Sequence, residues 1–154
     1  MACRFRSPLE PPVADGSLRR ALSAVVVEAR FRVRYAETDA MGVAHHANYI
    51  VWFEVGRGEF MWQQGGSYAD LEAQGYFLPV TEVKARYVSP CRYGDMITVR
   101  TRVVELRSRQ VVFGYEIVNA AGQTLCWGET VHVCTDAEGR VRALSVWVRE
   151  LLSK

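Results

Sequence analysis

The chain has 154 residues, a formal net charge of +2 and hydrophobic residues at 49% of its positions. This size predicts one globular domain with a continuous core and leaves no room for a separate cofactor domain. The basic residues are spread along the sequence, which argues against nucleic acid as the main partner. The sequence lacks the run of about 18 apolar residues that a membrane-spanning helix requires, so no membrane span is expected.

The first 28 residues differ in composition from the rest. Residues 7–20 contain three prolines, one glycine and few large apolar side chains. We therefore predict a disordered or loosely attached extension at 1–28 and a folded domain at 29–154. Arginines near the start are also typical of a transit peptide, but Glu10 and Asp15 argue against one. The start is a poor secretory signal and the cysteines form no CxxC pair, so we expect reduced thiols and a cytoplasmic location.

A strand and a long helix are predicted next. Apolar residues alternate with arginines over Phe31–Tyr35, which indicates a strand with one buried face. Thr38–Asn48 interrupts the alternation. From Ala47 the apolar spacing becomes helical, and the helix is expected to end near residues 65–66. Its apolar side chains cover so much of the circumference that it must be buried on several sides.

Glycines mark both this helix and the segment after it. Gly56 and Gly58 would each cost about 1 kcal/mol relative to alanine, which is tolerated where another backbone comes close. A sheet wrapped around the helix would require that approach. Ser67 is then the expected N-cap of a short helix running to Gln74, with Gly75 as its stop. This second helix is a candidate lid or wall of a site.

Four strand candidates with alternating apolar residues follow: Leu78–Val88, Met96–Leu106, Gln110–Asn119 and Thr124–Cys134. Their connections are short and polar or contain glycine, which predicts an antiparallel four-strand meander. One strand, one buried helix and this meander give an α+β domain in which a curved five-stranded antiparallel sheet wraps around a central helix. Residues 145–151 either form a short amphipathic helix or lie on the sheet.

The stretch between the first strand and the long helix is the candidate site. It places Asp39 in a glycine-containing turn shortly before the helix begins. A helix start offers unpaired backbone N–H groups and a partial positive charge. A carboxylate that faces such donors is suited to attack on an activated carbonyl. Judged on residue type alone, Asp39 is equally well explained as a structural turn residue.

The residues that extend this pattern are Thr38-Asp39, Gly42-Val43, His46, Asn48-Tyr49 and Trp52-Phe53-Glu54. In this fixed order they resemble the signature of the 4-hydroxybenzoyl-CoA thioesterase-like branch of the hotdog superfamily, and most closely the YbgC-type acyl-CoA thioesterases. The resemblance runs from about residue 29 to residue 144. It implies the hotdog fold and hydrolysis of an acyl thioester to the free acid and CoA, without a metal or organic cofactor.

The resemblance also implies catalytic roles for three residues. Asp39 either attacks the thioester carbonyl directly or activates water, and the sequence leaves this choice open. His46 supplies a backbone N–H to the carbonyl oxygen, and its imidazole is a candidate to orient water or protonate the leaving thiolate. Tyr35 matches a tyrosine that similar enzymes keep ahead of the aspartate, and its hydroxyl is a candidate to hydrogen-bond in the site, although an ordinary strand-end aromatic explains it nearly as well.

Six further residues are candidates for substrate binding. They are Gly42, Val43, His45, Asn48, Tyr49 and Glu54. Core packing is the main alternative for Tyr49. Glu54 either positions a water molecule, as in related enzymes, or pairs with Arg57 one helical turn later.

The resemblance implies a homodimer or homotetramer with the cleft between subunits, and pairing would also protect one edge of a lone sheet. The substrate is an acyl-CoA or acyl-carrier thioester. The chain length of its acyl group, its carrier and the residues that bind its phosphates stay open. A non-catalytic module that binds acyl thioesters is the main alternative function. A hotdog dehydratase is disfavoured because its motif requires a histidine at position 44, where this chain has Ala44.

Overall fold

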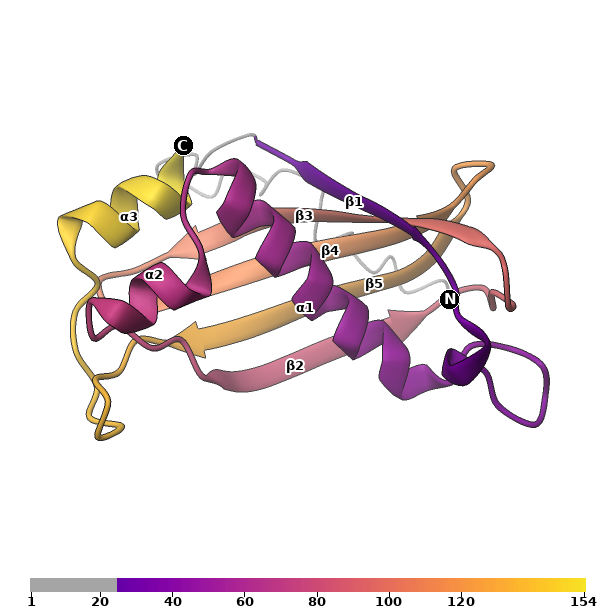
Figure 1. The fold of residues 1–154 in the computed structure, drawn as a ribbon, viewed down its shortest axis with the longest axis horizontal. Helices are drawn as coiled ribbons and strands as arrows, with labels where there is room; N and C mark the ends of the chain where they lie inside the picture. Colours follow the sequence, from indigo (N-terminus) through magenta and orange to yellow (C-terminus); the bar gives the residue numbers. More distant parts are fainter. Residues whose placement is uncertain (1–24) are drawn as a thin grey trace, which may run out of the picture.

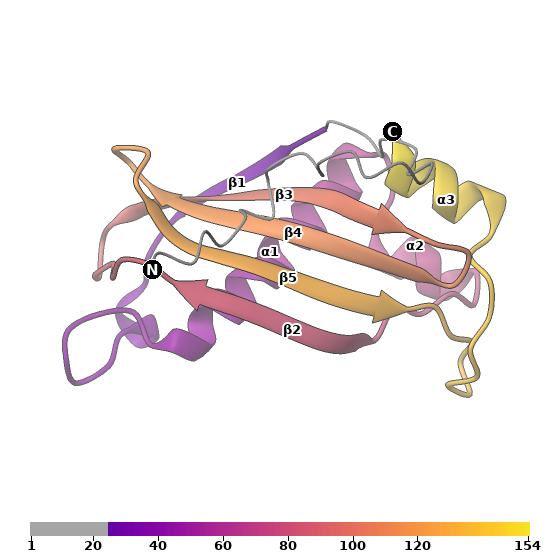
Figure 2. The same cartoon turned by 180° about the vertical axis from the view of Figure 1, so that it is seen from behind.

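The computed structural model of the protein describes residues 25–154, so most of the predicted extension lies outside this range. The strands are β1 (Val27–Arg32), β2 (Val80–Tyr87), β3 (Met96–Leu106), β4 (Gln110–Asn119) and β5 (Thr124–Val133). The helices are α1 (His46–Gln63), α2 (Tyr68–Ala73) and α3 (Val146–Ser153), with a short 3-10 turn η1 (Tyr35–Glu37). Figure 1 shows α1 crossing one face of the five-stranded sheet, whereas Figure 2 shows the opposite face. The predicted α+β architecture, a hotdog fold, is confirmed.

The bounds predicted for the first strand are wrong. β1 runs from Val27 to Arg32 and pairs with β3, whereas Tyr35 lies in η1. Val27, Ala29 and Phe31 share the inward face of the strand, so its alternation starts earlier than expected. The sequence does not indicate this start, because three consecutive valines at residues 25–27 lack the alternation of apolar and polar residues.

The predicted four-strand meander is also wrong in one respect. The strand order is β1-β3-β4-β5-β2, all neighbours being antiparallel, so only β3, β4 and β5 form a meander. β2 pairs with β5, and Val83 lies opposite Thr130. The link from residue 88 to residue 95 is not the hairpin that its length predicts. It instead carries the chain past β5 and β4 to β3, a distance of about 14 Å at roughly 4.8 Å per strand.

The core lies between α1 and the sheet. Trp52, Phe53 and Phe60 on α1 are buried, and the Phe53 ring stacks on Tyr115 of β4 with centroids 4.4 Å apart. A Cβ atom at Gly56 would lie 2.3 Å from the Thr101 hydroxyl oxygen, which confirms that the sheet comes close at this glycine. Gly58 meets nothing within 4 Å, so the same explanation does not hold there.

The two short helices cover one end of the core. Ser67 caps α2 as predicted, because its hydroxyl accepts the Asp70 backbone N–H at 3.1 Å. Gly75 follows α2 with a positive φ of 78°, which favours glycine. Residues 146–153 form a helix and do not lie on the sheet as a strand would, and α3 buries Val148 and Leu152. None of the helices in the described range is long and apolar enough to cross a bilayer.

Candidate active site

The loop before α1 is a narrow hairpin with Asp39 at its base. The Asp39 N–H donates to the Val43 carbonyl, and the Gly42 N–H donates to the Asp39 carbonyl, both at 2.9 Å. Thr38 and Ala44 form an isolated bridge beneath them. Gly42 has a φ of 75°, a left-handed conformation that other residues rarely adopt. The glycine in the motif is therefore required by the turn itself.

The Asp39 carboxylate has one partner in this loop. Its Oδ1 atom accepts the Met41 N–H at 2.9 Å, which is an Asx turn. No second hydrogen bond to the carboxylate is found within residues 25–154, so Oδ2 is available to a ligand. The structural and the catalytic explanations of Asp39 are compatible, because one oxygen holds the turn and the other is directed to neither backbone nor side chain.

The start of α1 is fixed by neighbouring groups. The N-cap residue is His45, whose Nδ1 accepts the Ala47 N–H at 3.2 Å. Asn48 Nδ2 donates to the Glu37 carbonyl at 2.8 Å and ties the first turn to η1. The His46 N–H finds no acceptor in the described part of the chain. As a first-turn donor it is available to an anionic oxygen.

Asp39 and His46 line one pocket of about 290 Å³. Its wall consists of Asp39, Met41, Val43, Ala44, His46, Tyr49, Tyr87, Val88, Ser89 and Pro90. Four of the predicted site residues thus meet around one space. The segment from Tyr87 to Pro90 supplies the opposite wall, and sequence reasoning missed it. The one signal in the sequence is an aromatic residue close to a proline at the end of a strand.

Tyr87 holds the helix start from that wall. Its hydroxyl donates to the His46 carbonyl at 2.9 Å, and its ring lies edge-on to the rings of His46 and Tyr49. The Tyr49 hydroxyl lies 3.4 Å from the Cys91 sulfur beneath the pocket. Burial raises the pKa of both groups, so the Cys91 thiol stays protonated and is unsuited to act as a nucleophile.

Other predicted residues lie at the edge of this pocket or away from it. Tyr35 is 77% exposed and its ring packs against Tyr93, with centroids 5.7 Å apart. Gly42 forms the turn, while His45 and Asn48 fix the helix start. None of these four lines the pocket.

Glu54 is exposed on α1 and does not line the pocket either. No ion pair between Glu54 and Arg57 is present in the described range, so that alternative is wrong. Arg57 is instead buried and donates to the Tyr115 hydroxyl at 3.2 Å.

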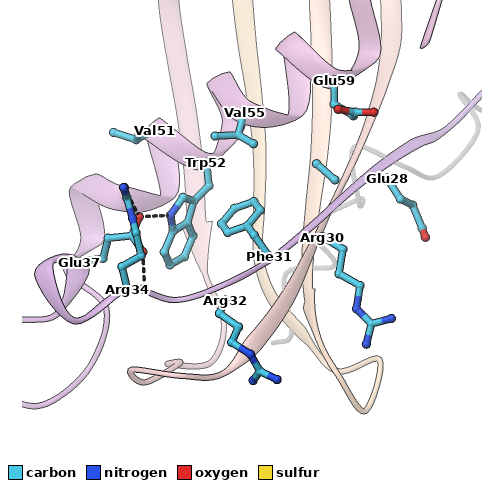
Figure 3. Close-up of a pocket in the computed structure, with 11 residues that line it drawn as sticks. Glu28, Arg30, Phe31, Arg32, Arg34, Glu37, Val51, Trp52, Val55 and Glu59 are labelled. Carbon is cyan, nitrogen blue, oxygen red and sulfur yellow. Dashed lines mark hydrogen bonds and ion pairs between the residues drawn. The ribbon is translucent and has the colours of Figure 1, made fainter. Parts of the chain in front are cut away.

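A larger groove of about 630 Å³ runs between α1 and β1 (Figure 3). Three glutamates line it, and the buried one, Glu37, accepts Trp52 Nε1–H at 3.0 Å and pairs with Arg34 at 2.9 Å. Burial opposes ionisation of Glu37, but these hydrogen bonds hold its pKa below the usual value. Because this carboxylate is already engaged and the groove contains neither Asp39 nor His46, the smaller pocket is the candidate site. No group of three potential metal-ligating side chains occurs among residues 25–154.

Comparison with known proteins decides the family. Residues 33–152 match the model of the thioesterase-like superfamily. The chain belongs to this superfamily. It is 39% identical to YneP of Bacillus subtilis over 113 residues, which cover 73% of this chain and 82% of YneP. It is 34% identical over 105 residues to the acyl-CoA thioester hydrolase YbgC of Escherichia coli, covering 68% of this chain and 78% of YbgC.

A solved relative of this thioesterase-like chain supports the same assignment. The structure of a DHNA-CoA thioesterase from Staphylococcus aureus superposes with a TM-score of 0.75 at 36% identity. The superposition covers 77% of this chain and 80% of the Staphylococcus chain.

Proposed function

We propose that this protein hydrolyses acyl-CoA thioesters to the free acid and CoA. The observation that carries the proposal is the shared pocket of the Asp39 carboxylate and the first turn of α1. Membership of the superfamily and the similarity to YbgC support this choice of reaction. The lining of the pocket is largely apolar apart from these groups, which suits an acyl chain next to a polarised carbonyl.

The chemistry follows from the placement of charges. As the Asp39 carboxylate or a water molecule adds to the thioester carbon, the carbonyl oxygen becomes negative, and the His46 N–H at the helix start stabilises that charge. Asp39 supplies the attack, either by its own Oδ2 or by taking a proton from water. The C–S bond then breaks, and the thiolate takes up a proton, for which the His46 imidazole is a candidate donor in the pocket. If Oδ2 attacks, water next hydrolyses the acyl-Asp39 anhydride and restores the carboxylate, so either route consumes one water for each thioester cleaved.

Release of free thiol from a panel of CoA esters tests the proposal. The panel should contain short, long and aromatic acyl groups, because pocket shape alone sets the preference. We expect turnover of at least one class by the purified wild-type protein. Tight binding of an ester without turnover would contradict the hydrolase function and support a non-catalytic binding module.

The assembly we propose is a homodimer or homotetramer in which a second subunit covers β2. This edge strand is exposed along almost its whole length, with Val83 39% and Tyr87 46% exposed. An unpaired edge strand that exposes Val80, Val83 and Tyr87 is a natural site for a second copy, and its Tyr87 end reaches the pocket. Light scattering after gel filtration should give a mass two or four times the 17.4 kDa of the chain. A monomer would contradict the proposal.

A cytoplasmic location is also part of the proposal. Cys91, Cys126 and Cys134 are buried and unpaired, which a reducing compartment favours.

Replacing Tyr87 by phenylalanine should lower kcat about threefold to tenfold with little change in stability. The ring keeps its contacts with Tyr49, but the hydrogen bond that holds the His46 carbonyl is lost, a loss of about 1 kcal/mol. The measurement is steady-state hydrolysis of the preferred ester beside a thermal melt. Tyr76→Phe is a matched control, since the Tyr76 hydroxyl accepts from Arg142 and Tyr76 does not line the pocket. Equal rates for wild type and Tyr87→Phe would exclude a positioning role for the hydroxyl.

A further inference from the structure

An exposed pair of aromatic rings lies beside the candidate site. Tyr35 and Tyr93 are 77% and 64% exposed, and their rings meet edge to face at 5.7 Å and 88°. Figure 1 shows that the loop before α1 and the link between β2 and β3 lie at the same end of the sheet. Adjacent exposed aromatic rings offer flat apolar surface on which a planar ligand can stack.

The turn that carries Tyr93 is held rigidly. The Asp95 N–H donates to the Arg92 carbonyl at 3.1 Å, and Asp95 Oδ2 accepts the Arg92 N–H at 2.8 Å. The Gly94 N–H donates to the Val33 carbonyl at 2.9 Å and joins the turn to the end of β1. The Tyr93 ring therefore stands on a fixed backbone. A ligand that binds it would lose little binding free energy to ordering this turn.

Two arginines flank this ring pair. Arg32 donates from NH1 to the Gly94 carbonyl at 2.9 Å, and Arg92 donates from NH1 to the Gly42 carbonyl at 3.1 Å. Neither guanidinium forms an ion pair within residues 25–154, so each keeps its charge and several N–H donors for a ligand. Because Gly42 belongs to the Asp39 turn, Arg92 joins the ring pair directly to the candidate site.

The neighbouring carboxylates do not cancel this charge. Asp95 accepts the Arg92 backbone N–H and forms no ion pair with either guanidinium within residues 25–154, and Glu37 is buried in its pair with Arg34. Asp39 is directed into the pocket. The surface therefore combines flat rings with backbone-anchored guanidinium groups, which are the two features that recognise a purine and a phosphate.

We infer that Tyr35, Tyr93, Arg32 and Arg92 form a subsite for the adenine nucleotide of CoA. This inference rests on the proposed function, because the thioester carried into the Asp39 pocket would bring that nucleotide to the pocket mouth. The adenine stacks on the tyrosine pair, and the phosphates accept from the two arginines. The alternative occupant is an acidic acyl carrier protein. Such a protein would bind the charged arginines, but it has no planar base to stack on the tyrosine rings.

The kinetic test compares two thioesters of the same acyl group, one of CoA and one of N-acetylcysteamine, which lacks the nucleotide. Tyr93→Ala combined with Arg32→Gln should raise KM for the CoA ester about tenfold or more, with kcat within about twofold. The N-acetylcysteamine ester should show an unchanged kcat/KM. Arg30→Gln is the matched control, because Arg30 is an exposed arginine on the same strand as Arg32. An equal KM for the CoA ester in wild type and in the double variant would overturn the assignment of the subsite.

Direct binding separates this inference from the proposed hydrolysis. Calorimetry with adenosine 3′,5′-bisphosphate should show binding to wild type and to Arg30→Gln, and at least about tenfold weaker binding to the double variant. This result is independent of turnover, so a protein without hydrolase activity still tests the subsite. Absence of nucleotide binding to wild type would refute the subsite. It would also be refuted if the double variant lost binding only of an acyl carrier protein thioester and bound the nucleotide as wild type does.

Discussion

Asp39→Asn is expected to lower kcat for thioester hydrolysis at least about a hundredfold while leaving the fold intact. The asparagine carbonyl oxygen can accept the same Met41 N–H that Asp39 Oδ1 accepts at 2.9 Å, so the turn before α1 is retained. The amide can neither attack a thioester carbon nor take a proton from water. The substitution therefore removes the chemistry of the residue and keeps its structural role.

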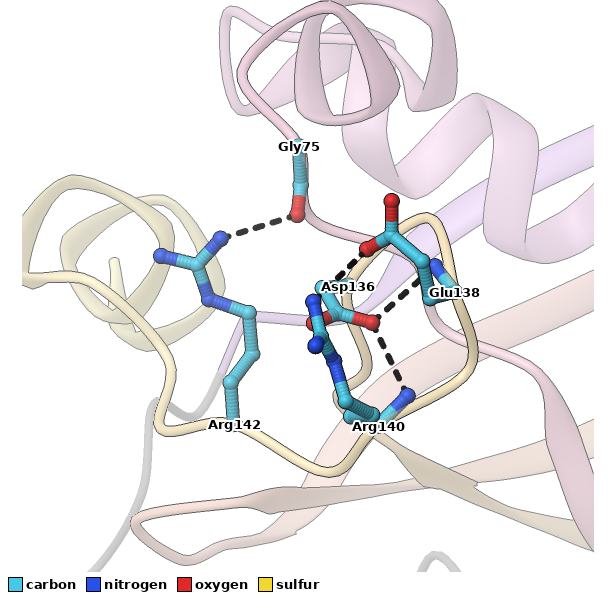
Figure 4. A network of polar contacts seen from close by, with 5 residues as sticks. All are labelled: Gly75, Asp136, Glu138, Arg140 and Arg142. Atoms are coloured by element: carbon cyan, nitrogen blue, oxygen red, sulfur yellow. Dashed lines mark hydrogen bonds and ion pairs between the residues drawn. The ribbon is translucent and has the colours of Figure 1, made fainter.

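The decisive measurement pairs kcat from thiol release with a thermal melt of the same preparation. Asp136→Asn is a matched control in the segment between β5 and α3, at the other end of the sheet, and Figure 4 shows the polar contacts of Asp136. Asp136 Oδ1 accepts the N–H of Glu138, two residues later, at 3.0 Å, which is the geometry of the Asp39 turn. The control should keep the wild-type kcat. If Asp39→Asn also kept it, Asp39 would be a turn residue only and catalysis would have to be assigned elsewhere.

Local patterns in the sequence were sufficient for much of the fold. The alternation in β3 and β4 gave their bounds correctly, and Ser67 and Gly75 marked the limits of α2. The glycine at position 42 indicated a tight turn next to Asp39, because only a left-handed residue closes that hairpin. These features depend on neighbours within a few residues, which a single sequence displays directly.

Contacts between distant segments were not predictable in the same way. Tyr87 reaches His46 because β2 lies beside β5 at the sheet edge, an order that the short links along the chain did not indicate. Similarly, Arg57 has a carboxylate one helical turn away, yet its guanidinium turns inward to Tyr115. The second wall of the pocket and the buried polar groups therefore required the tertiary structure.

Those buried polar groups form a chain of hydrogen bonds from Arg57 to the Leu78 carbonyl. Arg57 donates to Tyr115 at 3.2 Å, Tyr115 lies 2.7 Å from Thr130, and Thr130 lies 2.8 Å from His132 Nε2. At the other end His132 Nδ1 lies 2.9 Å from the Leu78 carbonyl. An arginine can only donate and a carbonyl can only accept. His132 therefore carries a proton on Nδ1, and in the neutral ring Nε2 accepts from Thr130.

Protonation of His132 would break this chain. A proton on Nε2 would make that atom a donor, and because Arg57 can only donate, one hydroxyl hydrogen of Thr130 or Tyr115 would be left without an acceptor in the chain. Burial lowers the pKa of His132 to about 4, and the positive charge of Arg57 acts in the same direction. The unfolded chain has an ordinary histidine pKa of about 6.5. Between these values the unfolded state binds more protons, so stability is lost as the pH falls from about 6.5 towards 4.

The free energy of unfolding should accordingly fall by about 2 kcal/mol between pH 7 and pH 5 on account of His132 alone. Urea denaturation at both pH values measures this change. His132→Gln supplies the comparison, because an amide can donate to Leu78 and accept from Thr130 without titrating. Exposed groups contribute equally to both proteins, so the difference between their pH dependences isolates the buried histidine. The same loss of stability in wild type and in His132→Gln would show that the histidine is not held neutral by the chain from Arg57.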